Sequence, residues 1–215
     1  AVIRRVCSLV RGGGVSLIRV TDNGAGIPSE EVELAFDRYA TSKIGDLHDL
    51  ESISSLGFRG EALPSIAAVA EVDIVTRTAG ESAGTYLILK DGAIVNRRSQ
   101  GCPQGTTVTV RNLFRNVPAR LKFLKSLSTE NSHIANVVSQ YALAFPEVKI
   151  ALFIDGRATL RTPGSGHLID SVAQVYGLEV ARNMLPIEGE GWPSGATTSS
   201  PQVTGVVGSP AVGRS

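Results

Sequence analysis

The sequence predicts an α+β fold, an α/β sandwich in which a mainly antiparallel sheet carries helices on one face. Short Val- and Ile-rich stretches follow one another at hairpin spacing, and Asp91-Gly92 and Asp155-Gly156 supply tight turns between two of the pairs. Other stretches carry apolar residues three or four positions apart, as amphipathic helices do. Strands joined by hairpins pair antiparallel, so we expect the helices to cover one face of the sheet.

Ten stretches are predicted to be strands. The first two form a hairpin, because Gly12-Gly13-Gly14 lies between them and glycine reaches positive φ without a Cβ clash. The two Asp-Gly pairs close further hairpins in the same way. The predicted strands cover residues 2–10, 15–21, 71–77, 84–90, 93–98, 105–111, 148–154, 157–161, 184–188 and 202–208.

Six stretches are predicted to be helices. Pro28-Ser29 supplies a start signal for the first, whose apolar residues run from Val32 to Tyr39. Thr129 is the expected cap of the longest helix, and Pro146 closes it. Pro64 is tolerable only in the first turn of its helix. The predicted helices cover residues 32–39, 47–54, 60–69, 117–125, 129–144 and 167–176.

The character of the chain changes after Pro163-Gly164-Ser165-Gly166. We interpret residues 162–166 as a linker, and the Gly/Ser/Thr/Pro-rich stretch 189–201 as a loop. The sequence therefore predicts two domains, residues 1–161 and residues 167–215, the second being the opening of a further α/β unit.

Composition excludes several classes of protein. With 42% hydrophobic and 19% charged residues, the chain is not intrinsically disordered. Its 2 Cys cannot build a disulfide framework or a cysteine-rich zinc site, which favours a reducing compartment. The net charge of +1 gives no general attraction to nucleic acid. No apolar run approaches the roughly 20 residues of a membrane-spanning helix, and residues 1–10 lack a secretory signal pattern.

One candidate site directly follows a predicted strand, at Asp22-Asn23-Gly24-Ala25-Gly26-Ile27. A carboxylate there can accept a hydrogen bond from an exocyclic amine, and alternating glycines let the backbone pass close to a flat ligand. The alternative is a strand-ending turn, because Asp-Asn-Gly is ordinary turn chemistry.

Three further segments suit phosphate chemistry or ordinary turns. Gly57-Phe58-Arg59-Gly60-Glu61-Ala62-Leu63 opens a helix, whose free N–H groups and partial positive charge favour anions. It is neither a Walker loop nor a Rossmann turn, and the alternative is a glycine-hinged helix start. Ala40-Thr41-Ser42-Lys43 offers hydroxyls and a cation, or a solvated helix end. Gly105-Thr106, taken alone, is a turn.

In this order, the four segments resemble the ATP-site motifs of the GHKL (Bergerat-fold) ATPases. Within that superfamily, "ATSKI", "SLGFRGEAL" and, at residues 112–126, "NLFRNVPARLKFLKS" are similar to the MutL family of DNA mismatch repair proteins. The resemblance runs from about Arg11 to Leu160 and more weakly to Ser215, through Pro210 and Arg214. It implies a Bergerat-type ATPase domain, followed by a transducer-like domain similar to domain 2 of ribosomal protein S5.

The resemblance also implies a site for ATP and Mg²⁺. Asp22 would receive the adenine amino group, the backbone of Gly24, Gly26 and Ile27 would lie beside the base, and Thr106 would support the adenine end through its hydroxyl or a water. The lid around the triphosphate and Mg²⁺ would comprise Thr41, Ser42, Lys43, Gly57, Phe58, Arg59, Gly60, Glu61, Ala62 and Leu63.

No catalytic or metal-binding residue is expected within this sequence. The family carries its catalytic glutamate and its Mg²⁺-binding asparagine on one helix before the Gly12–Gly14 hairpin, so we expect them upstream of Ala1, and negligible turnover by the chain alone. Glu30, Glu31 and Glu61 are candidate bases by residue type only, and exposed helix-terminal charges are the better interpretation.

The implied partners are DNA, a second copy or a paralogue, a mismatch-recognition protein, and a downstream nuclease or helicase, in the cytoplasm or at the nucleoid. The alternatives are a nucleotide-binding module without turnover, and a GHKL chaperone or type II topoisomerase subunit, although those families lack the quoted strings.

A basic cluster could contact DNA phosphates or form a solvated helix face. It consists of Arg111, Arg115, Arg120, Lys122 and Lys125. His48, His133 and His167 are scattered and give little support for metal binding.

Overall fold

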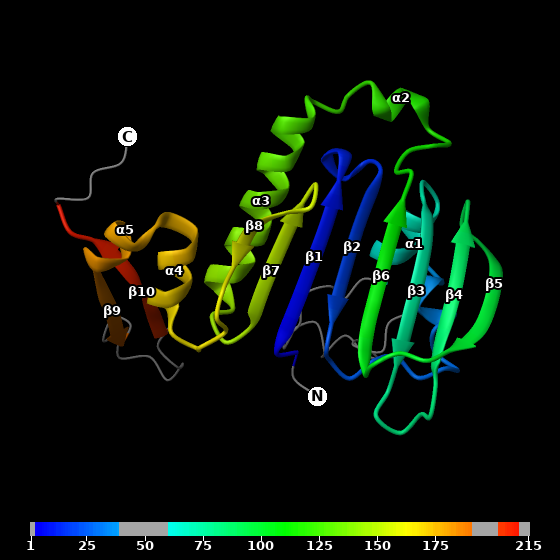
Figure 1. Cartoon of the computed structure of the whole chain (residues 1–215), viewed down its shortest axis with the longest axis horizontal. Coiled ribbons are helices and arrows are strands. Elements are labelled where there is room, and N and C mark those ends of the chain that lie inside the picture. The colour runs from blue at the N-terminus through cyan, green and yellow to red at the C-terminus, as the bar shows by residue number, and fades with distance from the viewer. Residues whose placement is uncertain (1–2, 39–59, 191–201, 211–215) are drawn as a thin grey trace, which may run out of the picture.

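The chain folds around an eight-stranded sheet with the strand order β5-β4-β3-β6-β2-β1-β7-β8 (Figure 1). The structure is a computed structural model and describes residues 3–38, 60–190 and 202–210. The strands are β1 (Arg5–Arg11), β2 (Leu17–Asp22), β3 (Glu71–Arg77), β4 (Gly84–Lys90), β5 (Ala93–Gln100), β6 (Gly105–Arg111), β7 (Lys149–Ile154) and β8 (Arg157–Arg161). All neighbouring pairs are antiparallel except β1 and β7, which confirms the mainly antiparallel sheet.

The one parallel pair follows from the path of the chain between β6 and β7. Two helices, α2 (Pro118–Leu121) and α3 (Leu127–Ala144), occupy this connection. Parallel neighbours need such a crossover, whereas antiparallel neighbours can be joined by a hairpin. The crossover returns the chain beside β1, where Val10 pairs with Ile154.

The apolar side chains of the sheet gather on one face. The register places Val10, Ile18, Val110, Val72 and Leu89 next to one another across five strands. Residues that pair across a sheet point to the same side, so these five share a face.

Two core clusters lie on that face. The cluster around Val72 and Leu89 packs with α1 (Ala62–Ala67) and with residues near the 3₁₀ turn η2 (Leu34–Phe36). The cluster around Val10 includes Ala142 of α3. The prediction that the helices cover one face of the sheet is therefore confirmed.

Some helix boundaries were predicted wrongly. The described part of the stretch from Val32 to Tyr39 forms turns and the short η2, not an α-helix. The longest helix begins at Leu127, because the hydroxyl of Ser126 accepts a hydrogen bond from Thr129 N at 3.2 Å. Thr129 therefore lies inside the first turn and is not the cap. The predicted helix 47–54 lies outside the described residues.

The chain after β8 forms a smaller unit with its own two-stranded sheet, set apart from the large sheet in Figure 1. It contains α4 (Leu168–Tyr176), α5 (Leu178–Arg182), β9 (Met184–Glu190) and β10 (Gln202–Gly208). The helix α5 was not predicted, since its five residues are too few to show a helical period. The boundary between domains at 162–166 stays a prediction. Among the described residues, no helix is long and apolar enough to cross a membrane.

Candidate functional site

The ends of three strands meet on the helix-bearing face of the sheet. Asp22 is the last residue of β2 and lies four residues after Ile18, so both side chains point to this face. Thr76 near the end of β3 pairs with Thr106 at the start of β6. Thr106 precedes Val110 by four residues and shares its face in the same way. The sheet thus brings the predicted residues Asp22 and Thr106 to one region.

The carboxylate of Asp22 is held in place by a hydrogen bond to one of its two oxygens. Oδ1 accepts a hydrogen bond from Gly24 N at 2.8 Å, which is the turn that the sequence allowed as an alternative. No hydrogen bond joins Oδ2 to any other residue that the structure describes. The half-buried carboxylate therefore keeps one oxygen available for a donor such as an exocyclic amine.

Gly26 is required by the protein's own backbone. Its φ is +77°, and a Cβ at this position would lie 2.1 Å from the carbonyl oxygen of Arg77. Gly105 shows the same relation, since a Cβ there would lie 2.2 Å from the carbonyl oxygen of Asp22. The sequence offered close approach of a ligand as the reason for Gly26. The structure adds a second reason, the tight contact between the ends of β2, β3 and β6.

Thr76 is a site residue that the sequence reasoning missed. Its side chain is fully buried, and its Oγ1 accepts a hydrogen bond from Ile27 N at 2.8 Å. The same oxygen lies 3.0 Å from Oγ1 of Thr106. The alternation of Val72 and Ile74 within the predicted strand already placed Thr76 on the inner face. A buried hydroxyl there needs a partner, which was the available signal.

A carboxylate fixes the chain just beyond Ile27. Glu81 accepts hydrogen bonds from Thr78 N at 2.9 Å, from the Thr78 hydroxyl at 2.8 Å and from Ser29 N at 2.9 Å. These bonds, led by that from Thr78 N, lower the pKa of Glu81 from its ordinary 4.5 to about 2. Arg97 adds a hydrogen bond to Ser29 O at 2.8 Å. The segment after the Asp22 turn is thereby tied to the loop between β3 and β4.

The expected phosphate-binding segments are described only in part. Thr41, Ser42, Lys43, Gly57, Phe58 and Arg59 lie outside the described residues. Gly60 has a φ of 62°, and α1 begins two residues later with Glu61 exposed at its start. Ala62 is exposed and Leu63 is half-buried. No hydrogen bond connects Gly60, Glu61, Ala62 or Leu63 with Asp22 in the described part of the chain, so the lid remains a prediction.

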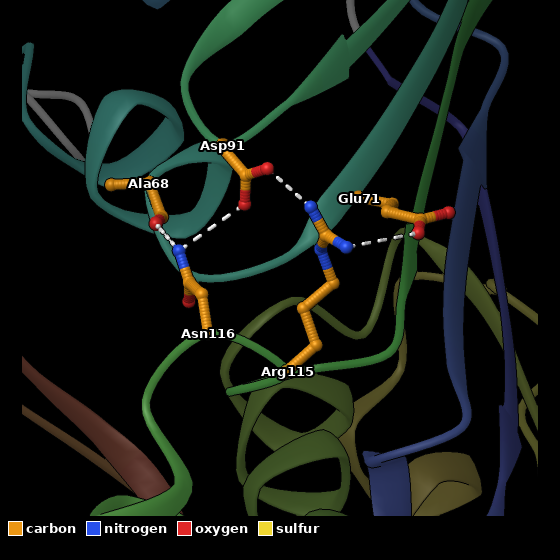
Figure 2. Close-up of polar contacts among 5 residues, drawn as sticks. All are labelled: Ala68, Glu71, Asp91, Arg115 and Asn116. Atoms are coloured by element: carbon orange, nitrogen blue, oxygen red, sulfur yellow. Dashed lines mark hydrogen bonds and ion pairs between the residues drawn. The ribbon is translucent and has the colours of Figure 1, made fainter.

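The other end of α1 is held by distant parts of the chain. The carbonyl of Ala67 accepts a hydrogen bond from Gly92 N at 2.9 Å, and that of Val69 accepts one from Phe114 N at 2.7 Å. Figure 2 shows the third, from Asn116 Nδ2 to the carbonyl of Ala68 at 2.8 Å. Ala67 is the last residue of α1, and Ala68 and Val69 follow it directly. Since carbonyls at a helix end lack partners within the helix, these donors hold the end of α1 against the turn after β4 and the segment after β6.

The predicted basic cluster does not form one uniform patch. Arg115 pairs with Asp91 and, at 3.9 Å, with Glu71 (Figure 2). Arg111 pairs with Asp73, which is buried on β3. The guanidinium of Arg120 lies 5.7 Å from the ring centre of Phe114. Lys122 and Lys125 are exposed, and neither forms an ion pair with a described residue.

The candidate bases and metal ligands do not assemble into a centre. Glu30, Glu31 and Glu61 are exposed, as the sequence interpretation favoured. His133 and His167 are exposed on and beside different helices, and His48 lies outside the described residues. The described residues hold no group of three or more His, Cys, Asp or Glu side chains that could bind a metal ion.

Known proteins resemble this chain closely in sequence. The DNA mismatch repair protein MutL of Halothermothrix orenii is 48% identical over 181 residues, which cover 84% of this chain and 28% of that protein. MutL of Symbiobacterium thermophilum is 45% identical over 212 residues, 98% of this chain and 32% of that protein. The chain therefore spans about a third of the length of these relatives. No family model matches it.

Solved structures agree with the sequence relatives. The Aquifex aeolicus MutL ATPase domain complexed with ADP has a TM-score of 0.68 and 31% identity, covering 87% of this chain and 65% of that chain. The N-terminal domain of a DNA repair protein, with a TM-score of 0.77 at 23% identity, supports the fold alone.

The fold, with helices on one face of a mainly antiparallel sheet and the Asp22 turn at a strand end, is that of a GHKL ATPase domain of the Bergerat type. Among such proteins the similarity is to MutL along most of the chain. The chain belongs to the MutL family of DNA mismatch repair proteins. This result sets aside the GHKL chaperones and topoisomerase subunits that were considered as alternatives.

Proposed function

We propose that this chain binds ATP at the end of β2, with the adenine amino group donating to Oδ2 of Asp22. The observation that carries the proposal is that the described residues bind one oxygen of that carboxylate and leave the other available. Gly24 N holds Oδ1 at 2.8 Å, so the second oxygen is fixed in direction. A fixed acceptor loses little freedom when a ligand binds, and this favours affinity.

The neighbouring groups fit the rest of the base. Gly26 is half-buried, so its backbone can border a flat ring, whereas Gly24 is buried beneath the side chain of Ile3 and serves to hold the turn. Thr106 contributes a hydroxyl from the facing strand end. The solved Aquifex aeolicus relative is described as complexed with ADP, which supports a nucleotide as the ligand. Mg²⁺ would accompany the triphosphate, and we assign no ligand for it among the described residues.

In the whole protein, we propose that ATP binding and hydrolysis gate N-terminal dimerisation, DNA clamping and signalling to downstream repair factors. The family membership supports this role, which would be carried out in the cytoplasm or at the nucleoid. Further partners are a mismatch-recognition protein and a downstream nuclease or helicase. Lid closure would involve the Thr41–Lys43 and Gly57–Leu63 segments.

The substitution Asp22→Asn tests the nucleotide site. Gly24 N–H selects the amide oxygen, so the amide NH₂ group takes the place of Oδ2 and faces the adenine amine, donor against donor. We expect ATP affinity to fall by about tenfold or more, since hydrogen bonds to charged groups contribute about 1.5–3 kcal/mol. Inosine triphosphate, which carries a carbonyl acceptor at this position, is expected to bind the variant as well as it binds the wild type, or better.

Calorimetric titration measures both affinities. Glu179→Gln, which removes one exposed carboxylate on α5, is the control for net charge and is expected to leave both unchanged. Equal ATP affinity in Asp22→Asn and the wild type would refute the proposed role of Asp22.

DNA binding is the second part of the proposal, and it rests on the two lysines of the predicted basic cluster. Lys122 and Lys125 are exposed, whereas Arg111 and Arg115 are paired with carboxylates. Replacing both lysines by Ala is expected to reduce the slope of log affinity against log salt by about 1 to 2. Fluorescence anisotropy with duplex DNA at several salt concentrations measures it. An unchanged slope would place the DNA contact elsewhere.

A further inference from the structure

Thr76 connects the segments that we propose to hold the adenine ring. Its hydroxyl oxygen lies 2.8 Å from Ile27 N, 3.0 Å from Oγ1 of Thr106 and 3.2 Å from the carbonyl oxygen of Gly105. The side chain is fully buried, so water does not replace these partners. No motif in the sequence marked this residue, and the proposed contacts to ATP do not include it.

The protons at this hydroxyl can be assigned between two arrangements. A threonine hydroxyl has one proton and two lone pairs, and Ile27 N–H takes one lone pair of Thr76. If Thr76 donates to Gly105, then Thr106 donates to Thr76 and can only accept from a ligand. If Thr76 instead donates to Thr106, the proton of Thr106 is free for a ligand.

The chemistry of purines selects between the two arrangements. Ring atom N1 of adenine is an acceptor, whereas N1 of guanine or hypoxanthine carries a proton. Only the second arrangement, in which Thr76 donates to Thr106, presents a donor to adenine. It therefore complements Oδ2 of Asp22, which accepts from the neighbouring amino group.

We propose that Thr76 is a positioning residue for base recognition. It accepts from Ile27 N–H, donates to Thr106, and so directs the Thr106 proton toward N1 of adenine, either directly or through one water. The same hydrogen bonds hold the chain at Ile27 against the start of β6. This inference rests on the proposed ATP site and adds a residue that would not itself touch the nucleotide.

Thr76→Val removes the hydroxyl and keeps the shape of the side chain. Ile27 N–H then loses its acceptor and Thr106 loses its donor, so the direction of the Thr106 proton is no longer set. Thr76→Ser restores both bonds. Thr85→Val is a matched control, because Thr85 pairs with Thr76 from β4 and is also buried, at 8% exposure. Its hydroxyl makes no hydrogen bond with Ile27, Gly105 or Thr106.

The experiment compares two nucleotides on each full-length variant. ATP and 1-deaza-ATP differ only in N1, which is a C–H group in the analogue. We expect the wild type to bind ATP about fivefold more tightly than 1-deaza-ATP, as the loss of one neutral hydrogen bond predicts. In Thr76→Val this ratio is expected to fall to about 2, because Thr106 keeps its proton but that proton is no longer directed toward N1. Thr106→Val, which removes the proton, is expected to give a ratio of about 1. Thr76→Ser and Thr85→Val are expected to keep the wild-type ratio.

The ratio separates positioning from a purely structural role. A general loss of stability weakens both nucleotides alike and leaves their ratio unchanged. A wild-type ratio in Thr76→Val would overturn the inference while leaving the ATP site intact. A wild type that binds ATP but ignores the change at N1 would overturn the role of Thr106, and one that does not bind ATP would overturn the site itself. If Thr76→Val does not fold, Thr76→Cys, with its weaker S–H donor, is expected to show an intermediate ratio.

Discussion

Replacing Gly26 by Ala is expected to damage the fold at the ends of β2 and β3. The position has a φ of +77°, and the new Cβ would lie 2.1 Å from the carbonyl oxygen and 2.5 Å from the carbonyl carbon of Arg77. These are backbone atoms of a strand that pairs on both sides, so they cannot rotate away as a side chain would. The chain at Gly26 must shift, and the hydrogen bond from Ile27 N to Thr76 is lost with it.

The expected magnitude follows from three contributions. A left-handed conformation costs a residue with a Cβ about 1–2 kcal/mol. Forcing a methyl group into filled space costs about 1–3 kcal/mol, and the lost hydrogen bond about 1 kcal/mol. We therefore expect a loss of about 4 kcal/mol in the free energy of unfolding. That loss is a large share of the roughly 5–15 kcal/mol that keeps an ordinary domain folded.

Two other glycines in the same chain separate these contributions. Gly156 has a φ of +82°, and a Cβ added there would meet nothing within 4 Å, so Gly156→Ala carries the conformational cost alone. Gly80 has open space and no left-handed φ, so Gly80→Ala is expected to change stability by less than about 0.5 kcal/mol. Urea unfolding followed by circular dichroism gives all three values. If Gly26→Ala costs no more than Gly156→Ala, the contact with Arg77 does not constrain this position and the reasoning is refuted.

Three further predictions concern the polar contacts around the site. Glu81 has its pKa lowered on folding to about 2, so it stabilises the fold above its ordinary pKa of 4.5 and loses that contribution as the pH falls toward 2. In acid titrations followed by fluorescence, Glu81→Gln should lack this part of the pH dependence, and an identical profile would contradict it. Asn116→Ala, which removes the donor to Ala68 in Figure 2, should lower thermal stability by about 1 kcal/mol. Asn136→Ala, on the exposed side of α3, should not lower it. Asp73→Asn leaves Arg111 without its buried partner and should cost about 2 kcal/mol in urea unfolding. The surface change Glu33→Gln should cost less than about 0.5 kcal/mol, and equal losses would show that burial of Asp73 is unimportant.

The strands could be predicted from sequence because their signals are local. Alternation of apolar residues and the Asp-Gly turns lie within a few positions of one another, and the predicted stretches match β1 to β8 to within about three residues at each end. The start of α3 could not be predicted in this way. Ser126 and Thr129 are both good cap residues, and only the three-dimensional path of the chain before α3 decides between them.

The polar contacts of the site depend on pairs that are distant in sequence. Thr76 lies 49 positions from Ile27, and nothing in the sequence near either residue indicates the other. The five basic residues do not form a single positive patch, for a similar reason. Asp73 and Asp91, which neutralise two of its members, are supplied by β3 and by the turn after β4. Strand order decides these partners, and spacing along the chain does not show strand order.

The two interpretations of Asp22-Asn23-Gly24 that the sequence left open are not exclusive, because a carboxylate has two oxygens. The turn uses Oδ1, through the bond from Gly24 N. It also fixes the direction of Oδ2, whereas in a carboxylate that makes no hydrogen bond this oxygen would have no fixed direction. On the same face, Val20 of β2 is 38% exposed, although its pairing partners Ser8 and Val108 are buried and half-buried. An exposed apolar side chain two residues before an oriented acceptor is suited to a flat heterocycle with an exocyclic amine. The turn chemistry is thus part of the support for the proposed ATP site.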